Sequence, residues 1–233
     1  MTGLKTLISE HLHTQLVFTN IPFNNKTIIV KKGVYNEDKQ IDVRYGVNII
    51  GEDNPTITSN LSTYLFIAYE DMRINGISFV NHYSEGDAGV ILSTKSVYLN
   101  NSNFINCTSE GYGGAIYAYK DIYAENTSFI NNTAYVGGSI NGLNINVNNC
   151  TFINSSTKLS GYDNEESQGG AIEGGDIKVN NCTFIDNSAE YIGGAINSKF
   201  TYSIVNVTNS IFISNHVKYG SGGAISLKQK ITM

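Results

Sequence analysis

Hydrophobic and polar residues alternate along most of this chain in short blocks. Ile145 and Val147 form one such block, and Ile177 and Val179 form another, each pair separated by one polar residue. A period of two is typical of β-strands that bury one face. Asn and Gly bound these blocks, and helical spacing is absent after about residue 20. The pattern therefore predicts an all-β chain of many short strands.

Two motifs recur from residue 79 onward. The first is a phenylalanine followed by an aliphatic and a polar residue, at Phe79, Phe104, Phe129, Phe152, Phe184 and Phe212. The second is Gly-Gly-small-Ile, which begins at Gly113, Gly137, Gly169, Gly193 and Gly222. The unit is about 24 residues long, with an insertion of about eight residues within 155–168 and another of about four near 198–202. Repetition at this period indicates a solenoid.

The length of the unit selects the kind of solenoid. About 24 residues at roughly 3.3 Å each allow three short strands and three turns. This predicts the rung of a right-handed parallel β-helix, with the phenylalanines stacked inside. Asn106, Asn131, Asn154 and then Asp186 would form a ladder at one turn, where side-chain amides bond between rungs. Each Gly-Gly pair would make a corner where a Cβ clashes or φ is positive.

The first third of the chain fits the same scheme less regularly. Its alternation predicts strands at 27–30, 41–43, 47–50, 57–58, 64–67 and 72–77. Apolar residues at helical spacing predict an amphipathic helix at 3–16, which we assign as the cap of the solenoid. The expected organisation is a capping helix in 1–20 and a β-helix in 21–233.

The last repeat has no visible cap, because the sequence ends at Met233 within it. This favours a fragment of a longer solenoid. An uncapped sheet edge is a template for pairing, so the same feature predicts end-to-end self-association.

Composition narrows the functional classes. The chain has 233 residues, 15% charged residues and a net charge of −5. Scattered basic residues argue against nucleic-acid binding, and no apolar run is long enough for a transmembrane helix. The first ten residues lack the pattern of a secretory signal peptide. The 30 Asn and 23 Gly recur in register, which codon bias does not explain.

The longer insertion carries the candidate binding residues. Tyr162 is the candidate aromatic anchor, and Asp163, Glu165 and Glu166 form a polar rim. We expect a binding loop here, because a loop leaving a regular wall offers a distinct surface. The acidic stretch, which continues to Glu173 and Asp176, is interpreted as a solvated loop, with a Ca²⁺ or substrate site as the alternative. No catalytic, cofactor or metal residues are assigned.

Histidine and cysteine add little chemistry. His11, His13, His82 and His216 share no metal spacing, and a surface position is expected for them. Cys150 and Cys182 occupy the same repeat position, which leaves buried ladder thiols or a disulfide open. Cys107 occupies a different repeat position and has no partner there.

The paired motifs also carry a family resemblance. Gly-Gly-Ala-Ile at 113–116, 169–172, 193–196 and 222–225, with Phe-x-x-Asn at 129–132, 184–187 and 212–215, resembles the polymorphic outer-membrane-protein repeat of bacterial and archaeal adhesin-like surface proteins. His82, Cys107 and Ser155 replace the Asn of this motif in other copies. Segments 27–35 and 47–51 are similar to the first rungs of pectin-lyase-like β-helices.

The resemblance implies a location and a role. It implies a cell-surface or extracellular module that mediates attachment to a host or microbial surface glycan or protein, or that acts as a stalk. A non-enzymatic module without cofactor is the favoured interpretation. The alternative is a pectin-lyase-like carbohydrate-active enzyme, either a polysaccharide lyase or a glycoside hydrolase. It would need a groove where acidic side chains from three consecutive rungs converge.

Overall fold

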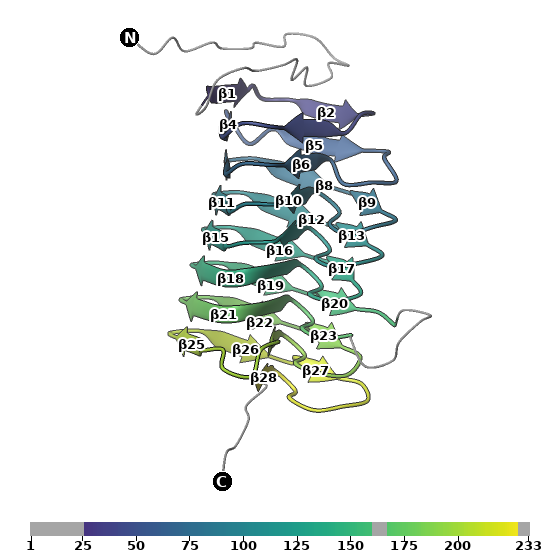
Figure 1. The fold of residues 1–233 in the computed structure, drawn as a ribbon, viewed down its shortest axis with the longest axis vertical. Helices are drawn as coiled ribbons and strands as arrows, with labels where there is room; N and C mark the ends of the chain where they lie inside the picture. The colour runs from purple at the N-terminus through teal and green to yellow at the C-terminus, as the bar shows by residue number, and fades with distance from the viewer. Residues whose placement is uncertain (1–25, 160–166, 228–233) are drawn as a thin grey trace.

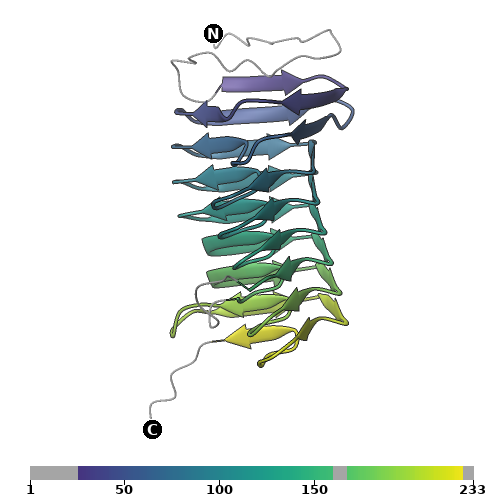
Figure 2. The same ribbon diagram turned by 90° about the vertical axis from the view of Figure 1, so that its right-hand side faces the viewer.

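The computed structural model describes residues 26–159 and 167–227. Within them all regular structure is β-strand, and the strands wind into a parallel solenoid of about eight turns with about 25 residues per turn. Figure 1 shows the turns stacked along one axis, and Figure 2 shows the same stack from the side. The predicted all-β parallel β-helix is confirmed.

Three parallel sheets form the walls. Sheet A contains two ladders that share β18 (Ile140–Asn148) and β21 (Ile172–Asn180). The other strands of its first ladder are β1 (Lys26–Val30), β4 (Val47–Gly51), β7 (Met72–Asn75), β11 (Val97–Asn100), β15 (Ile122–Glu125) and β25 (Val205–Thr208). The other strands of its second ladder are β3 (Ile41–Val43), β6 (Phe66–Ala68), β10 (Ile91–Ser93), β14 (Ile116–Ala118), β24 (Ile196–Ser198) and β28 (Ile225–Leu227).

Sheets B and C complete each turn. Sheet B consists of β2 (Val34–Glu37), β5 (Thr56–Ser59), β8 (Ser78–Val80), β12 (Asn103–Ile105), β16 (Ser128–Ile130), β19 (Thr151–Ile153), β22 (Thr183–Ile185) and β26 (Ile211–Ile213). Sheet C consists of β9 (Tyr83–Ser84), β13 (Thr108–Ser109), β17 (Thr133–Ala134), β20 (Ser156–Thr157), β23 (Ser188–Ala189) and β27 (His216–Val217). All the pairs are parallel, as the repeat predicts. The strand β2 is additional to the predicted set.

Three corners with positive φ define most turns of the helix. The corner before sheet B has Asn101, Asn126, Asn149, Asn181 and Asn209, with φ between 48° and 52°. The corner after sheet B has Asn81, Asn106, Asn131, Asn154, Asp186 and Ser214, with φ between 51° and 59°. Asn tolerates this left-handed region better than most residues do, which explains the composition. The predicted ladder forms, with Asn106, Asn131 and Asn154 each donating to the Asn one turn earlier.

The Gly-Gly pair makes the third corner, and its two residues meet different demands. The first glycine of each pair has φ between 65° and 79°. At the second glycine, for example Gly138, an added Cβ would overlap the carbonyl oxygen of Gly170 in the next turn. The prediction that a Cβ clashes or φ is positive is therefore confirmed, with one reason belonging to each glycine.

The phenylalanines stack in the interior behind sheet B. From Phe104 to Phe212 the ring centroids of neighbours lie 4.7–5.2 Å apart, and the planes differ by at most 8°. Phe104, Phe129, Phe152 and Phe184 are fully buried. Phe212 is partly exposed in the last described turn. Burial of the ladder confirms the predicted register.

The Asn of Phe-x-x-Asn points into the interior and bonds to backbone groups there. Asn132 is fully buried, and its Oδ1 accepts a hydrogen bond from the Cys107 N–H at 2.9 Å. Its Nδ2 donates to the carbonyl of Phe104 and to Ser139 Oγ. This Asn thus joins neighbouring turns by satisfying buried backbone groups, which would otherwise destabilise the fold.

His82 takes the same interior position in an earlier turn. Its Nδ1 lies 2.8 Å from Ser59 Oγ and its Nε2 lies 3.0 Å from the Ile57 carbonyl oxygen. Burial lowers its pKa to about 4, although the hydrogen bond to Ile57 acts in the opposite direction. The expected surface position is wrong for His82, because the ring replaces a structural Asn. His216 is exposed, whereas His11 and His13 lie outside the described residues.

The three cysteines are buried and free. The backbone N–H of Cys150 lies 3.4 Å from Cys182 Sγ, so the two thiols continue an interior ladder of small side chains. Each thiol also donates to a carbonyl two residues earlier in sequence. Of the two alternatives, the structure has the ladder thiols. The predicted capping helix at 3–16 lies outside the described residues.

Candidate functional site

A shallow groove of about 450 Å³ lies on the outer face of the first ladder of sheet A. It crosses β4, β7, β11, β15 and β18, and register places five outward side chains in one column along it. These residues are Asn48, Arg73, Tyr98, Tyr123 and Asn146. Because a parallel ladder repeats about every 4.8 Å, neighbouring side chains in the column are in contact range.

The centre of the column is an aromatic stack. The rings of Tyr98 and Tyr123 are 4.9 Å apart and differ by 4° in plane. The guanidinium carbon of Arg73 lies 4.3 Å from the Tyr98 ring centroid, a distance at which a cation is attracted to the ring face. Arg73 and Tyr123 therefore cover opposite faces of Tyr98. The outer face of Tyr123 adjoins the next position in the column, where the smaller Asn146 stands.

A second column of polar side chains borders the groove. It contains Asn75, Asn100, Glu125 and Asn148. Asn126 at the adjoining corner donates from Nδ2 to Asn100 Oδ1 at 3.2 Å. Asn148 Nδ2 donates to Glu125 Oε1 at 3.4 Å. The groove therefore presents an aromatic strip beside groups that both donate and accept hydrogen bonds.

Burial and a nearby acidic group keep the Tyr123 phenol protonated. Partial burial raises the pKa of Tyr123, and the nearby Asp121 carboxylate raises it further. The Tyr123 hydroxyl lies 3.5 Å from Asp121 Oδ2, and Asp121 Oδ1 accepts from Asn144 at 2.8 Å. At neutral pH the hydroxyl therefore acts as a hydrogen-bond donor.

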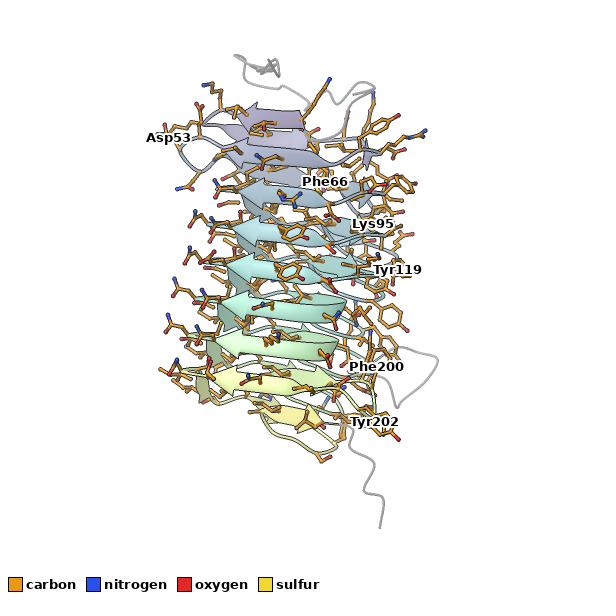
Figure 3. All side chains as sticks on the ribbon, turned by 60° about the vertical axis from the view of Figure 1, so that its left-hand side comes forward. Asp53, Phe66, Lys95, Tyr119, Phe200 and Tyr202 are labelled. Carbon is orange, nitrogen blue, oxygen red and sulfur yellow. The ribbon has the colours of Figure 1, made fainter. Side chains whose placement is uncertain are left out.

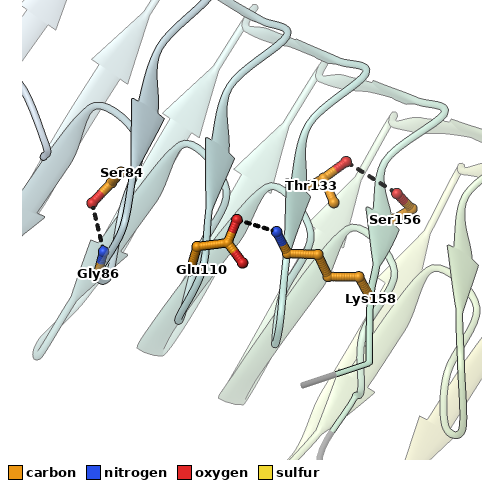
Figure 4. Close-up of polar contacts among 6 residues, drawn as sticks. All are labelled: Ser84, Gly86, Glu110, Thr133, Ser156 and Lys158. Carbon is orange, nitrogen blue, oxygen red and sulfur yellow. Dashed lines mark hydrogen bonds and ion pairs between the residues drawn. The ribbon is translucent and has the colours of Figure 1, made fainter. Parts of the chain in front are cut away.

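The predicted binding loop begins and ends on firmly bonded residues. Tyr162, Asp163, Glu165 and Glu166 themselves lie outside the described residues. At the entry, Lys158 forms an ion pair with Glu110 two turns earlier (Figure 4). At the exit, Ser167 Oγ donates to Thr157 Oγ1 at 2.8 Å. The two ends of the insertion are thus joined to each other and to sheet C.

The remainder of the acidic stretch separates into two environments. Asp176 is exposed, as expected of a solvated residue, and its Oδ1 accepts from the Ile204 N–H at 2.8 Å. Glu173 is only 3% exposed, so its interpretation as a solvated residue is wrong. It lies within β21, and Asn197 Nδ2 donates to its Oε2 at 2.7 Å. Burial raises the pKa of Glu173 to about 8, against the effects of Asn197 and Lys199.

Two features of these sites were missed in the sequence. Tyr98 and Tyr123 are 25 residues apart and share one repeat position, a signal that could have revealed the stack. Burial of Glu173 has no comparable signal, because it depends on how the later insertion folds. In the described ranges, no three His, Cys, Asp or Glu side chains are grouped to hold a metal ion. The same ranges contain no helix suited to crossing a membrane.

Residues 181–199 match the repeat of the Chlamydia polymorphic membrane protein family. The match runs from the Asn181 corner through Phe-x-x-Asn to Gly-Gly-Ala-Ile and the end of β24. The chain therefore contains a repeat of the polymorphic membrane protein type, and this repeat forms a parallel β-helix. No curated protein matches the chain.

Proposed function

We propose that this chain is a cell-surface β-helix module that attaches to carbohydrate through the groove of sheet A. The observation that carries the proposal is the stack of Arg73, Tyr98 and Tyr123, which leaves one tyrosine face toward a small neighbour. Members of the matched repeat family are outer-membrane surface proteins, and the family is not an enzyme family. Both facts support an attachment role at a surface.

The groove chemistry favours a neutral polysaccharide. The apolar face of a sugar ring can lie on Tyr123 over Asn146, in the same way that apolar ligand surface packs on aromatic side chains in binding sites. The amides of Asn75, Asn100 and Asn148 can bond sugar hydroxyls as donors and as acceptors. One arginine and one glutamate line the groove, so it lacks the dominant positive charge expected for a polyanion.

Binding to immobilised neutral glycans tests this proposal. Tyr123→Ala is expected to weaken binding at least tenfold, because it removes the stacking face and the phenol donor. Tyr83→Ala is the matched control, since Tyr83 on sheet C is 40% exposed and Tyr123 is 38% exposed. An equal loss of glycan binding in both variants, or no loss of binding in either, contradicts a binding site in the groove.

The insertion loop is a second proposed binding surface, and variants distinguish the two. Replacing Tyr162 by Ala, together with Asp163→Asn, Glu165→Gln and Glu166→Gln, removes its aromatic and acidic groups. A deletion must stay within 160–166, because Ser156 and Thr157 form β20 and the Ser167 carbonyl accepts from Tyr191. Loss of binding only in the loop variants places attachment on the insertion and not in the groove.

Two other outcomes define the alternatives. Cleavage of pectin-like polymers by the intact chain, dependent on Asp121 or Glu125 beside the groove, would support the carbohydrate-active enzyme and contradict a non-enzymatic module. Binding to no glycan or cell surface would support a stalk.

The proposal also includes end-to-end association. Among the described strands, β25, β26, β27 and β28 form the last edge of the three sheets. Ile225 lies in this edge and is partly exposed. Ile225→Lys is expected to reduce concentration-dependent association, because a charge on a sheet edge opposes pairing. Sedimentation of the parent chain as a monomer at high concentration would exclude it.

A further inference from the structure

Three polar side chains are buried on the outer face of sheet A, in its second ladder. Asn141 on β18, Glu173 on β21 and Asn197 on β24 are consecutive register partners. They are only 1%, 3% and 3% exposed. Because outward positions of a solenoid wall normally meet solvent, burial of this amide–carboxyl–amide column sets it apart.

Lys199 folds back across the column from the insertion that follows β24. Its Nζ lies 3.5 Å from Asn141 Oδ1, although the two residues are 58 positions apart. The next side chain, Phe200, covers Gly175, where an added Cβ would lie 3.0 Å from the ring. Figure 3 shows Phe200 on the same side of the stack as Tyr119 and Tyr202. The amine therefore reaches past β21 to the amide carbonyl on β18, two strands away.

The environment shifts the pKa of both ionisable groups. Burial lowers the pKa of Lys199, although attraction to Glu173 opposes the change. Burial keeps Glu173 largely protonated at neutral pH, with a pKa of about 8. A desolvated lysine amine is a nucleophile, and a carboxyl whose pKa lies near the working pH can both donate and accept a proton. Amine, amide and acid are also held in place, which removes much of the entropic barrier to their reaction.

We propose that Lys199 and Asn141 form an intramolecular isopeptide bond, with Glu173 as the acid–base group. Lys199 Nζ attacks Cγ of Asn141, and the new C–N bond forms as the bond from Cγ to Nδ2 breaks. Glu173 gives its proton to Nδ2 and recovers one from Nζ. Ammonia leaves, so one amine and one primary amide become one secondary amide and ammonia. No oxidant, reductant or further reactant is consumed.

The product joins β18 covalently to the turn of β24 and bypasses β21. Such a bond closes a long loop of the chain, and cross-links of long loops restrict the unfolded state most. This inference concerns the chain itself and stands independently of any ligand in the groove.

Intact-mass measurement of the purified full chain tests the proposal directly. The expected mass is lower than that of the sequence by one ammonia, and fragmentation should find the peptides of Asn141 and Lys199 joined. Glu173→Gln and Lys199→Arg should each have the full mass. Asn146 and Lys178 are the matched internal control. They are register partners on the adjacent strands β18 and β21, but both are exposed, so their peptides should stay separate.

Two results would overturn the proposal. One is the full sequence mass in a chain whose circular dichroism shows the folded β-sheet, and this result needs no variant to fold. The other is a loss of ammonia that persists in Lys199→Arg. Asn141 precedes Gly142, and a succinimide formed by attack of the Gly142 nitrogen would lose the same ammonia without using the lysine.

Discussion

The interior behind sheet B and the outer face of sheet A belong to the same turns, but their residues vary to very different extents. Behind sheet B, one position is phenylalanine in six consecutive turns. On the outer face of the second ladder of sheet A, aligned positions hold Asp42, Ile67, Leu92, Tyr117, Asn141, Glu173 and Asn197.

The difference has a physical cause. An interior side chain must fill the space left by the turns above and below, and close packing tolerates few changes of volume. Outward positions are held in register by backbone hydrogen bonds that do not depend on the side chain. The wall can therefore change its chemistry from turn to turn, as with the tyrosine stack and the Glu173 column, while the phenylalanine position behind sheet B stays constant.

The largest expected effect comes from opening the interior. Phe129→Ala should lower the free energy of unfolding by about 3–5 kcal/mol, because the rings of Phe104 and Phe152 stack on both faces and cannot both move into the cavity. Chemical denaturation measures this directly. A variant that unfolds at the denaturant concentration of the parent would contradict the role assigned to the ladder.

Acid should destabilise the interior through His82. Its pKa is about 4 in the folded state and near 6.5 when unfolded, so the unfolded chain binds the proton first as pH falls. Neutral His82 makes its full contribution to the free energy of unfolding above pH 6.5. This contribution, about 3 kcal/mol in total, is lost as pH falls toward 4.

The variant His82→Asn isolates this effect, because it restores the usual residue of the motif. The free energy of unfolding of this variant should change less between pH 6.5 and 4 than that of the parent. The raised pKa of Glu173 makes its contribution to stability fall as pH rises from 4.5 to 8. Both proteins contain Glu173, so this contribution cancels when the stability of the variant is subtracted from that of the parent. Parallel pH curves would show that His82 is already charged or not buried.

A smaller loss is expected at the buried amide ladder. Asn132→Ala leaves the Cys107 N–H and the Phe104 carbonyl without this partner, which should lower the free energy of unfolding by about 2 kcal/mol. The exposed Asn131→Ala is the matched control, since its Oδ1 and Nδ2 bond only within the surface ladder. The position nevertheless has positive φ, so Asn131→Gly should accompany it to separate backbone strain from amide bonding.

The sequence predicted the regions whose residues recur in many turns and missed features confined to one or two turns. Phe129 and Gly137 revealed the register because the same residue returns in the following turns. Strand β2 was missed, since Gly33 and the polar residues around Tyr35 resemble a turn when no later copy is compared. The surface expectation for His82 rested on its lack of a metal spacing, although its alignment with Asn132 indicated an interior position. Burial of Glu173 depends on Lys199 and Phe200 folding back across β21, which no local pattern shows.

The smallest change in stability is expected on the outer wall. Tyr123→Ala should lower the free energy of unfolding by about 1 kcal/mol, because an exposed stacked pair contributes about 0.5–1.5 kcal/mol beyond burial and the ladder hydrogen bonds of β15 remain. The comparison with Phe129→Ala is a matched one, since both variants remove an aromatic ring from a stack with neighbours about one rung away. The loss of unfolding free energy, measured by heat and by denaturant, should be severalfold larger in Phe129→Ala than in Tyr123→Ala. Only Tyr123→Ala should reduce glycan binding in the folded chain. Comparable destabilisation by both would show that the outer stack is a second core and would remove the argument for a binding surface.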